Sequence, residues 1–471
     1  MRKLFYHICL LLPALLLASV VLAKTRPISV TCYVHNYNGS AVFLYRIENG
    51  AAISLGFKRP DENNACTFSF EAKKEAVYYL RKAGIHPGTF NYAMYLRPGD
   101  SKTVQVYSSR LGGDFDSCYI MEPKKETRYL QQWAGLFNDI CSLGANQTKR
   151  DAFFTAYDAF VSKAEAFKKA SVTGDGYFNR LLAAKVDADI LYVKAAAFFY
   201  FSERMNSSYD TSAAHQPFYE ALLNEKFCEP ACLASEHGIQ LVNYILGYRQ
   251  YRQTAAPVKW PAIPFAQKMD QLGNDVVKGA YAASYMQSIR SYEQFRIDIE
   301  PFQTVINKTG YGNVYQQKLD ELTVFAKGAP GYNFLLPDIQ DKLVSLAGLK
   351  GKVVVVDMWA MWCASCLQEK PLYEKMVEEF KNRNDIVFLG ISYDGIGKKD
   401  PWKNFVARKG YQGIELLADP GDELYKYYKI EGIPRYMIFD KEGKIITVDA
   451  PRPSNPAFRK LIEQTLTPTG K

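Results

Sequence analysis

One stretch of the sequence decides the fold: Asp357-Met358-Trp359-Ala360-Met361-Trp362-Cys363-Ala364-Ser365-Cys366. It overlaps the end of a short apolar run, Val353 to Met358, which is typical of a central strand covered on both faces. Helical sequence then extends from Leu367 to Asn382. A strand that enters a helix through a Cys-x-x-Cys motif places the first cysteine at the helix N-terminus, where a thiolate is stabilised.

The sequence after this helix alternates between strand and helix patterns. The predicted strands and helical connectors are Ile386–Ile391, Pro401–Arg408, Ile414–Ala418, Glu423–Tyr428, Arg435–Asp440 and Lys444–Asp449. The last two strands flank Lys441-Glu442-Gly443, which is a hairpin signal. Alternating strands and helices that close in an antiparallel hairpin predict an α/β thioredoxin-like domain over residues 328–471.

The motifs of this domain occur together in register. The stretch from Asp357 to Cys366 resembles the active-site segment of thioredoxins, and Pro371 lies where thioredoxins kink the helix. Gly432-Ile433-Pro434 resembles the cis-proline loop of that family. The run from Cys366 to Pro371 resembles the Cys-x-x-Glu-x-Pro variant of the exported thiol–disulfide oxidoreductases, the TlpA/ResA-like group.

The two cysteines are the predicted catalytic pair. Cys363, at the start of the helix, is expected to be the thiolate that attacks a partner disulfide. Cys366, one turn further and less exposed, is expected to attack the mixed disulfide and release the product. The alternative is a stable structural disulfide, which the surrounding motifs disfavour.

Other site residues are predicted from their positions. A desolvated Asp357 carboxylate near the end of the buried strand is expected to accept the Cys366 proton, and Glu369 resembles the active-site glutamate of the group. Trp362 is expected to shield the pair. The backbone of Ile433, before Pro434, is expected to pair with a substrate chain. Ordinary structural or solvated roles for Asp357 and Glu369 remain open at this stage.

Two departures from the family pattern affect the redox potential. Arg435 stands where many relatives have threonine, and Ala364-Ser365 replaces the more usual Gly-Pro or Glu-Pro. The resemblance favours a reductase, whereas the residues leave the direction open. A peroxiredoxin needs a Pro-x-x-x-Thr-x-x-Cys segment, which this sequence does not contain. A structural zinc site would need a second ligand pair, so the sequence predicts neither metal nor cofactor.

The N-terminus is typical of an export signal. Arg2 and Lys3 precede an almost wholly apolar run from Ile8 to Ala23, which is shorter than the ~20 residues of a membrane-spanning helix. Residues 1–23 are therefore predicted to be a signal peptide cleaved before Lys24, with an uncleaved anchor as the alternative. The position of Cys9 does not fit a lipoprotein signal, so the protein is expected to be periplasmic.

Two further domains are predicted between the signal and the thioredoxin-like domain. Residues 24–122 carry short alternating strands with Asn-Gly turns and predict a small antiparallel β-sandwich. Residues 123–327 carry helical periodicity, for example in Phe153, Tyr157 and Phe160, and predict an all-α domain.

Charge and cysteine content limit the remaining possibilities. The net charge of +9 is spread without a polybasic block, so nucleic-acid binding is disfavoured. The resemblance implies protein thiols and disulfides as partners, together with a membrane or periplasmic electron donor. The competing class is a partner- or glycan-binding exported protein with a vestigial redox domain. The sequence does not give the oligomeric state, or the pairing of the remaining cysteines: Cys32, Cys66, Cys118, Cys141, Cys228 and Cys232.

Overall fold

The computed structural model describes residues 26–36, 41–82, 92–108, 115, 117–200, 209–223, 229–254, 263–430 and 432–467. The predicted signal peptide and Cys228 lie outside these residues. Packing divides the chain into two compact units, the first Met1–Phe227 with Ala231–Arg249 and the second Cys228–Pro230 with Gln250–Lys471. Among the described residues, no helix combines the length and the apolar character needed to cross a bilayer.

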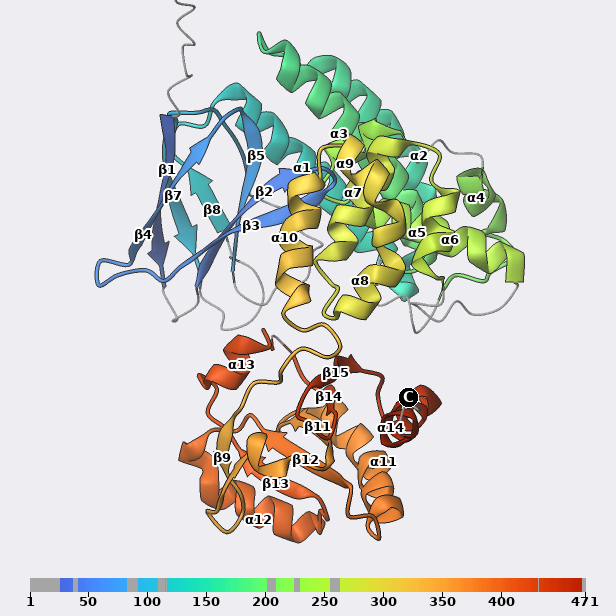
Figure 1. Cartoon of the computed structure of the whole chain (residues 1–471). Helices are drawn as coiled ribbons and strands as arrows, with labels where there is room; N and C mark the ends of the chain where they lie inside the picture. The colour runs from blue at the N-terminus through green and yellow to red at the C-terminus, as the bar shows by residue number, and fades with distance from the viewer. Residues whose placement is uncertain are drawn as a thin grey trace, which may run out of the picture. The chain divides into compact units, whose positions relative to one another are not determined.

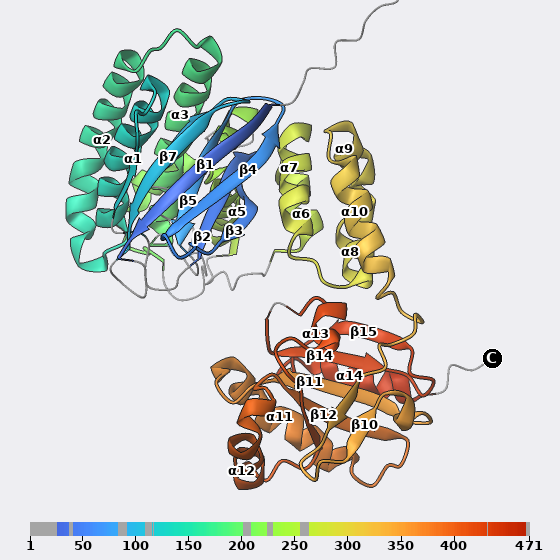
Figure 2. The ribbon, with the colours of Figure 1, turned by 90° about the vertical axis from the view of Figure 1, so that its left-hand side faces the viewer.

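The first unit begins with two sheets that pack face to face. One sheet has the strand order β4-β1-β7-β8 and the other β3-β2-β5-β6 (Figure 2). The strands are β1 (Arg26–His35), β2 (Val42–Glu48), β3 (Ala51–Lys58), β4 (Ala65–Ala72), β5 (Ala76–Lys82), β6 (Ala93–Leu96), β7 (Ser101–Tyr107) and β8 (Ser117–Ile120). Inward-facing side chains such as Val30, Leu44 and Val104 form one core.

The sandwich differs from the sequence prediction in one pairing. β1 and β7 are parallel, with Ser29 opposite Ser101, whereas an antiparallel sandwich was expected. The two strands are far apart in sequence, so no hairpin forces them to be antiparallel. The strands β3, β5 and β8 were not predicted. β3 is largely exposed and lacks regular alternation of apolar residues, and β5 is buried along nearly its whole length.

Helices complete the first unit: α1 (Lys125–Gly144), α2 (Arg150–Ala170), α3 (Gly176–Phe198), α4 (Gln216–Glu220) and residues 238–249 of α5 (Gly238–Thr254). α1 packs on β6, and the backbone N–H of Tyr95 donates to Thr127 Oγ1 over 3.1 Å. Lys185 of α3 is buried between the carboxylates of Asp189 and Glu236. The middle region is helical, as the sequence predicts; the boundaries at residues 122 and 327 stay predictions.

The second unit starts with a group of short helices: α6 (Phe265–Gln271), α7 (Asp275–Met286), α8 (Tyr292–Asp298), α9 (Gln303–Lys308) and α10 (Gly312–Thr323). α7, α9 and α10 pack on one another. The side chain of Thr309 fills the space beside Gly279, where an added Cβ would lie 1.9 Å from Thr309 Oγ1.

The rest of the second unit is a thioredoxin-like α/β domain (Figure 1). A five-stranded sheet has the order β13-β12-β11-β14-β15, in which β11 pairs in parallel with β12 and antiparallel with β14. Its elements are β11 (Val353–Trp359), α11 (Ala364–Phe380), β12 (Ile386–Ser392), α12 (Lys399–Lys409), β13 (Ile414–Leu417), α13 (Glu423–Tyr427), β14 (Arg435–Phe439), β15 (Ile445–Ala450) and α14 (Pro456–Leu466).

Both faces of this sheet are covered, which explains the run of valines in β11. Val353 and Val355 pack with Tyr373 of α11 and Phe458 of α14. Val354 and Val356 face the opposite core, which includes Leu424 of α13 and residues around the short strands β9 (Leu335–Pro337) and β10 (Leu343–Ser345). The end of β11 therefore reaches the N-terminus of α11 from a rigid, buried position.

Candidate functional site

The Cys-x-x-Cys motif forms the start of α11. Cys363 is the N-cap residue, and its Sγ accepts a hydrogen bond from the backbone N–H of Cys366 over 3.2 Å. The two sulfurs are joined in a disulfide. Cys363 is 5% exposed and Cys366 1%. The first free N–H groups of a helix and its dipole favour negative charge at this point, so the position suits a sulfur that becomes a thiolate on reduction.

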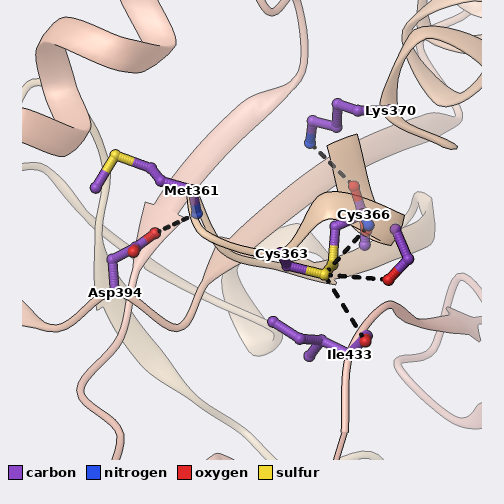
Figure 3. The surroundings of a disulfide bond; sticks show 8 residues. Met361, Cys363, Cys366, Lys370, Asp394 and Ile433 are labelled. Atoms are coloured by element: carbon purple, nitrogen blue, oxygen red, sulfur yellow. Dashed lines mark hydrogen bonds and ion pairs between the residues drawn. A yellow bond between two sulfur atoms is a disulfide. The ribbon is translucent and has the colours of Figure 1, made fainter. Parts of the chain in front are cut away.

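A loop before β14 faces the disulfide (Figure 3). The Ile433–Pro434 peptide bond is cis, and the carbonyl oxygen of Ile433 lies 3.8 Å from Cys363 Sγ. Ser365 Oγ lies 3.5 Å from the same sulfur. The structure therefore brings Cys363, Cys366 and the Ile433–Pro434 loop together, although they are about 70 residues apart in sequence.

The strand–helix connection before the cysteines is fixed by Asp394, which follows β12. Its Oδ2 accepts a hydrogen bond from the backbone N–H of Met361 over 2.8 Å (Figure 3). The same oxygen accepts one from Ser392 Oγ over 2.7 Å. Trp362 is 62% exposed. The expectation that Trp362 shields the pair stays a prediction.

Asp357 lies in the middle of the buried sheet, 1% exposed. Its Oδ2 accepts a hydrogen bond from Lys370 Nζ over 3.1 Å. Within the described residues, Oδ1 has no hydrogen-bond partner. Burial raises the pKa of Asp357 to about 6, with Lys370 opposing the shift and Glu415 adding to it. A carboxylate with a free oxygen and this proton affinity can accept a proton near neutral pH.

Lys370 and Glu415 complete a buried cluster that was not predicted from the sequence. Lys370 Nζ lies 2.8 Å from Glu415 Oε1, and Trp359 Nε1 donates to Glu415 Oε2 over 2.9 Å. Burial alone would lower the pKa of Lys370, but the carboxylates of Glu415 and Asp357 raise it above its ordinary value. Two sequence signals were available: Lys370 is four residues after Cys366, and Glu415 interrupts an apolar strand.

The backbone makes room for this cluster at Gly390 of β12. A Cβ at position 390 would lie 2.1 Å from Glu415 Oε2 and 2.5 Å from Oε1, which is closer than side-chain atoms approach one another. Gly390 is the register partner of both Asp357 on β11 and Glu415 on β13. The glycine is therefore required by the space that the Glu415 carboxylate occupies.

Glu369 is also nearly buried, but it is held by a different part of the domain. Its Oε2 accepts a hydrogen bond from the backbone N–H of Ser454 over 2.9 Å, and its Oε1 accepts one from Ser454 Oγ over 2.8 Å. Ser454 lies just before α14. The structure thus ties Glu369 to this loop, whereas Asp357 is tied to α11 by Lys370.

Arg435, directly after the cis-proline, has a structural set of contacts. Its side chain is buried and donates to the carbonyl oxygens of Val448 over 2.8 Å and Tyr428 over 2.9 Å. A threonine cannot make this pair of contacts, so the departure from the family pattern changes how the loop is anchored to β15 and α13.

Comparisons with known proteins match the thioredoxin-like region of the chain. The model of the AhpC/TSA family matches residues 327–448. The thiol–disulfide oxidoreductase ResA of Bacillus thuringiensis is 30% identical over 128 residues, which are 27% of this chain and 70% of that protein. The chain belongs to the ResA-like thiol–disulfide oxidoreductases. ResA of Bacillus subtilis is 27% identical over 124 residues, 26% of this chain and 66% of the relative.

A solved structure gives a further match to this ResA-like domain. The thioredoxin domain of a thiol–disulfide oxidoreductase from Bacteroides vulgatus is 26% identical, and the match covers 30% of this chain and 99% of that domain with a TM-score of 0.27. The AhpC/TSA match concerns the thioredoxin-like region, and the chain lacks the Pro-x-x-x-Thr-x-x-Cys segment of a peroxiredoxin. The similarity to ResA gives the enzyme class, that of a thiol–disulfide oxidoreductase.

Proposed function

We propose that this chain reduces protein disulfides outside the cytoplasm by dithiol exchange through Cys363 and Cys366. The observation that carries the proposal is the placement of the cysteine pair at the N-terminus of α11, with the Cys366 N–H directed at Cys363 Sγ. The oxidised pair would be returned to the dithiol by a membrane or periplasmic electron donor. Export rests on the predicted signal peptide in residues 1–23.

The first step in this proposal is attack by Cys363. Its thiolate forms a bond to one sulfur of the substrate disulfide, and the other substrate sulfur leaves as a thiolate. The helix N-terminus stabilises the charge on Cys363 before the attack. Glu369, three residues after Cys366 on α11, is held by Ser454 and is proposed to influence this step.

The second step is resolution by Cys366. Asp357 accepts the Cys366 proton, the Cys366 sulfur attacks Cys363 Sγ, and the mixed disulfide breaks to release the reduced substrate. The buried position and raised pKa of Asp357 support its assignment as the base. Asp357 meets two conditions at once: Lys370, one turn after Cys366, donates to one of its oxygens, and its other oxygen has no hydrogen-bond partner. Among the described residues, no other carboxylate meets both conditions.

The substrate chain is proposed to lie against the Ile433–Pro434 loop. The Ile433 carbonyl oxygen faces the disulfide from the opposite loop and lies 3.8 Å from Cys363 Sγ. An extended substrate segment can pair with this backbone as an added strand. Trp362, the residue before Cys363, has an exposed indole that offers an apolar surface for the residues that flank the substrate cysteine.

Insulin reduction by the full chain tests the proposed activity. We expect catalysed reduction in the presence of a dithiol, a difference of two alkylatable thiols between the oxidised and reduced forms, and loss of catalysis in Cys363→Ser. Cys141→Ser, a cysteine of α1 in the other unit, is the matched control and should retain activity. Full activity in Cys363→Ser would exclude the assignment.

The redox potential tests the direction. A potential near the value of thioredoxin, about −270 mV, agrees with a reductase, and one near that of DsbA, about −120 mV, indicates an oxidant. N-terminal sequencing of the exported protein tests the compartment: a mature chain that begins near Lys24 agrees with the proposal, and a retained Met1 on membrane-bound protein contradicts it.

A further inference from the structure

The buried cluster beneath the cysteines contains one lysine and two carboxylates in direct contact. Lys370 Nζ lies 3.1 Å from Asp357 Oδ2 and 2.8 Å from Glu415 Oε1, and all three side chains are 1–2% exposed. When both carboxylates are ionised, the three groups carry one excess negative charge. Such a charge is costly in a buried site, so the cluster favours binding of one proton.

The two carboxylates are not equivalent partners of the lysine. Glu415 receives two donors, Lys370 Nζ and Trp359 Nε1, one on each oxygen. Asp357 receives only Lys370, and within the described residues its Oδ1 accepts no hydrogen bond. Hydrogen bonds to a carboxylate favour its ionised form, so the shared proton is directed to Asp357.

Other titratable groups surround Asp357 from several elements. Glu374 lies on the far side of Lys370, with Oε1 3.9 Å from Nζ, and its pKa is raised by burial. The groups whose charges interact with Asp357 come from α11, β13, the loop before β13, and β14: Lys370, Tyr373, Glu374, Glu415, Tyr411 and Tyr436. Lys370 is the cation nearest to Asp357 in this set, so its charge cannot be replaced by a neighbour.

The cluster is linked to the redox pair through α11. Lys370 follows Cys366 by four residues and therefore lies on the same face of the helix, one turn further on. We propose that Lys370 and Glu415 are positioning residues for proton transfer from Cys366. Lys370 anchors Asp357 by one oxygen and leaves the other free, and Glu415 takes up part of the lysine charge and so keeps Asp357 basic.

This inference rests on the proposed function, and it specifies the resolving step. The Cys366 S–H bond breaks and its proton passes to Asp357 Oδ1. The Cys366 sulfur then forms a bond to Cys363 Sγ, and the bond between Cys363 and the substrate sulfur breaks. The substrate sulfur leaves with the electron pair. The protein dithiol is oxidised by two electrons and the substrate disulfide is reduced by two electrons.

A two-step probe separates attack from resolution. The reduced full chain is mixed with an equimolar amount of 5,5′-dithiobis(2-nitrobenzoate). The first release of coloured thiolate reports attack by Cys363, and the second reports resolution by Cys366. The rate of the second release is measured against pH for the wild type, Lys370→Met and Glu415→Gln.

The two variants should shift the acid limb of the pH profile, measured as the rate of the second thiolate release, in opposite directions. Lys370→Met removes the counter-ion of Asp357, so the midpoint moves to higher pH by about one unit or more. Glu415→Gln removes a like charge and leaves Lys370 to Asp357 alone, so the midpoint moves to lower pH. The double variant Lys370→Met/Glu415→Gln should lie between the two.

The double variant also serves as a control for folding, because it removes one cation and one anion together. If Lys370→Met alone fails to fold, Glu415→Gln and the double variant still test the roles of Lys370 and Glu415. The midpoint of Glu415→Gln should then lie at lower pH than that of the double variant. Shifts in the same direction, or no shift in any folded variant, would overturn the roles of Lys370 and Glu415. Absence of a second release in the wild type would instead overturn the proposed function.

Discussion

The two units of the chain each bury a lysine between two carboxylates, and each places a tryptophan beside one of them. In the first unit, Lys185 Nζ lies 2.9 Å from Asp189 and 2.5 Å from Glu236, and Trp133 Nε1 donates to Asp189 over 2.7 Å. In the second unit, Lys370 bridges Asp357 and Glu415, and Trp359 donates to Glu415. The composition of the two clusters is nearly the same.

The clusters differ in how completely the carboxylates are bonded. In the first unit, Ser235 donates to the second oxygen of Asp189 over 2.5 Å, and Tyr79 donates to the second oxygen of Glu236 over 3.1 Å. All four carboxylate oxygens of that cluster therefore have partners. In the second unit, Asp357 Oδ1 has none among the described residues.

This difference appears in the proton affinities. Burial would raise the pKa of Glu236, but Lys185 and His237 lower it below its ordinary value. Burial raises the pKa of Asp357 to about 6 despite Lys370. The closed cluster of the first unit thus holds its charges fixed, whereas the open cluster of the second unit can exchange a proton near neutral pH. Under the proposed function, one missing donor separates a structural charge cluster from one that takes part in proton transfer.

The largest expected effect is on the closed cluster. Lys185→Met leaves Asp189 and Glu236 buried without their cation, so the free energy of unfolding of the first unit should fall by about 3–5 kcal/mol. Chemical denaturation, with hydrogen exchange in α3 as a local probe, measures the loss. Lys163→Met, at an exposed position of α2, is the matched control and should be close to neutral. A shift in the pH profile of the second thiolate release would contradict the purely structural role.

The next largest expected effect is on the pH dependence of the free energy of unfolding, and it has opposite signs in the two units. The pKa of folded Asp357, about 6, is above its ordinary value of 3.8, so the ionised carboxylate destabilises the fold as pH rises through this interval. The difference corresponds to at most about 3 kcal/mol, and Asp357→Asn should therefore stabilise the protein above pH 7 and have little effect at pH 4.

Glu236→Gln supplies the contrast for Asp357→Asn. The pKa of folded Glu236 is lowered, so its ionised form stabilises the fold above the unfolded value, and this stabilisation is lost as pH falls through the folded pKa. The substitution should destabilise the protein at pH 7 and progressively less in acid. Unfolding curves of both variants at pH 4 and pH 8 measure the two signs. If the two substitutions changed the free energy of unfolding in the same direction at pH 8, the two clusters would not differ in how they hold charge.

The smallest expected effect is at Glu369, whose two oxygens are both bonded to Ser454. Ser454→Ala removes the hydroxyl donor and keeps the backbone donor, so the free energy of unfolding should fall by about 1 kcal/mol. The pH profile of the first thiolate release should move by less than about half a unit, because the backbone N–H of Ser454 still holds the Glu369 carboxylate in place. A larger shift of this pH profile would indicate that Glu369, like Asp357, exchanges a proton during the reaction.

Much of the thioredoxin-like domain could be predicted from the sequence, because its signals are local. The valines of β11, the cysteine pair and the hairpin at Lys441-Glu442-Gly443 each determine their own segment. The cysteines and the Ile433–Pro434 loop were found by motif. The helix α14 was missed, although Asn455 caps it and Pro456 begins it, because no family motif drew attention to it.

The buried charges could not be predicted in the same way, because they depend on contacts between distant segments. Lys370 reads as an ordinary helix residue until Asp357 and Glu415 lie on either side of it, and Glu415 is 45 residues further along the chain. The parallel pairing of β1 with β7 is likewise set by the sandwich core and not by a turn. The signals that were available, a charge in an apolar strand and a lysine on the same helix face as Cys366, indicate a site only when they are considered together.

The glycine at position 390 has a consequence for how related sequences can diverge. Because its missing Cβ is the space that the Glu415 carboxylate fills, neither position can drift alone: a larger residue at 390 expels the acid, and a shorter residue at 415 leaves a void beside the glycine. The two positions are neighbours on adjacent strands, so their substitutions should be inherited as a pair. A residue larger than glycine at 390 would displace the Glu415 carboxylate from Lys370, so a lineage that fills this position is expected to lose the buried charge cluster.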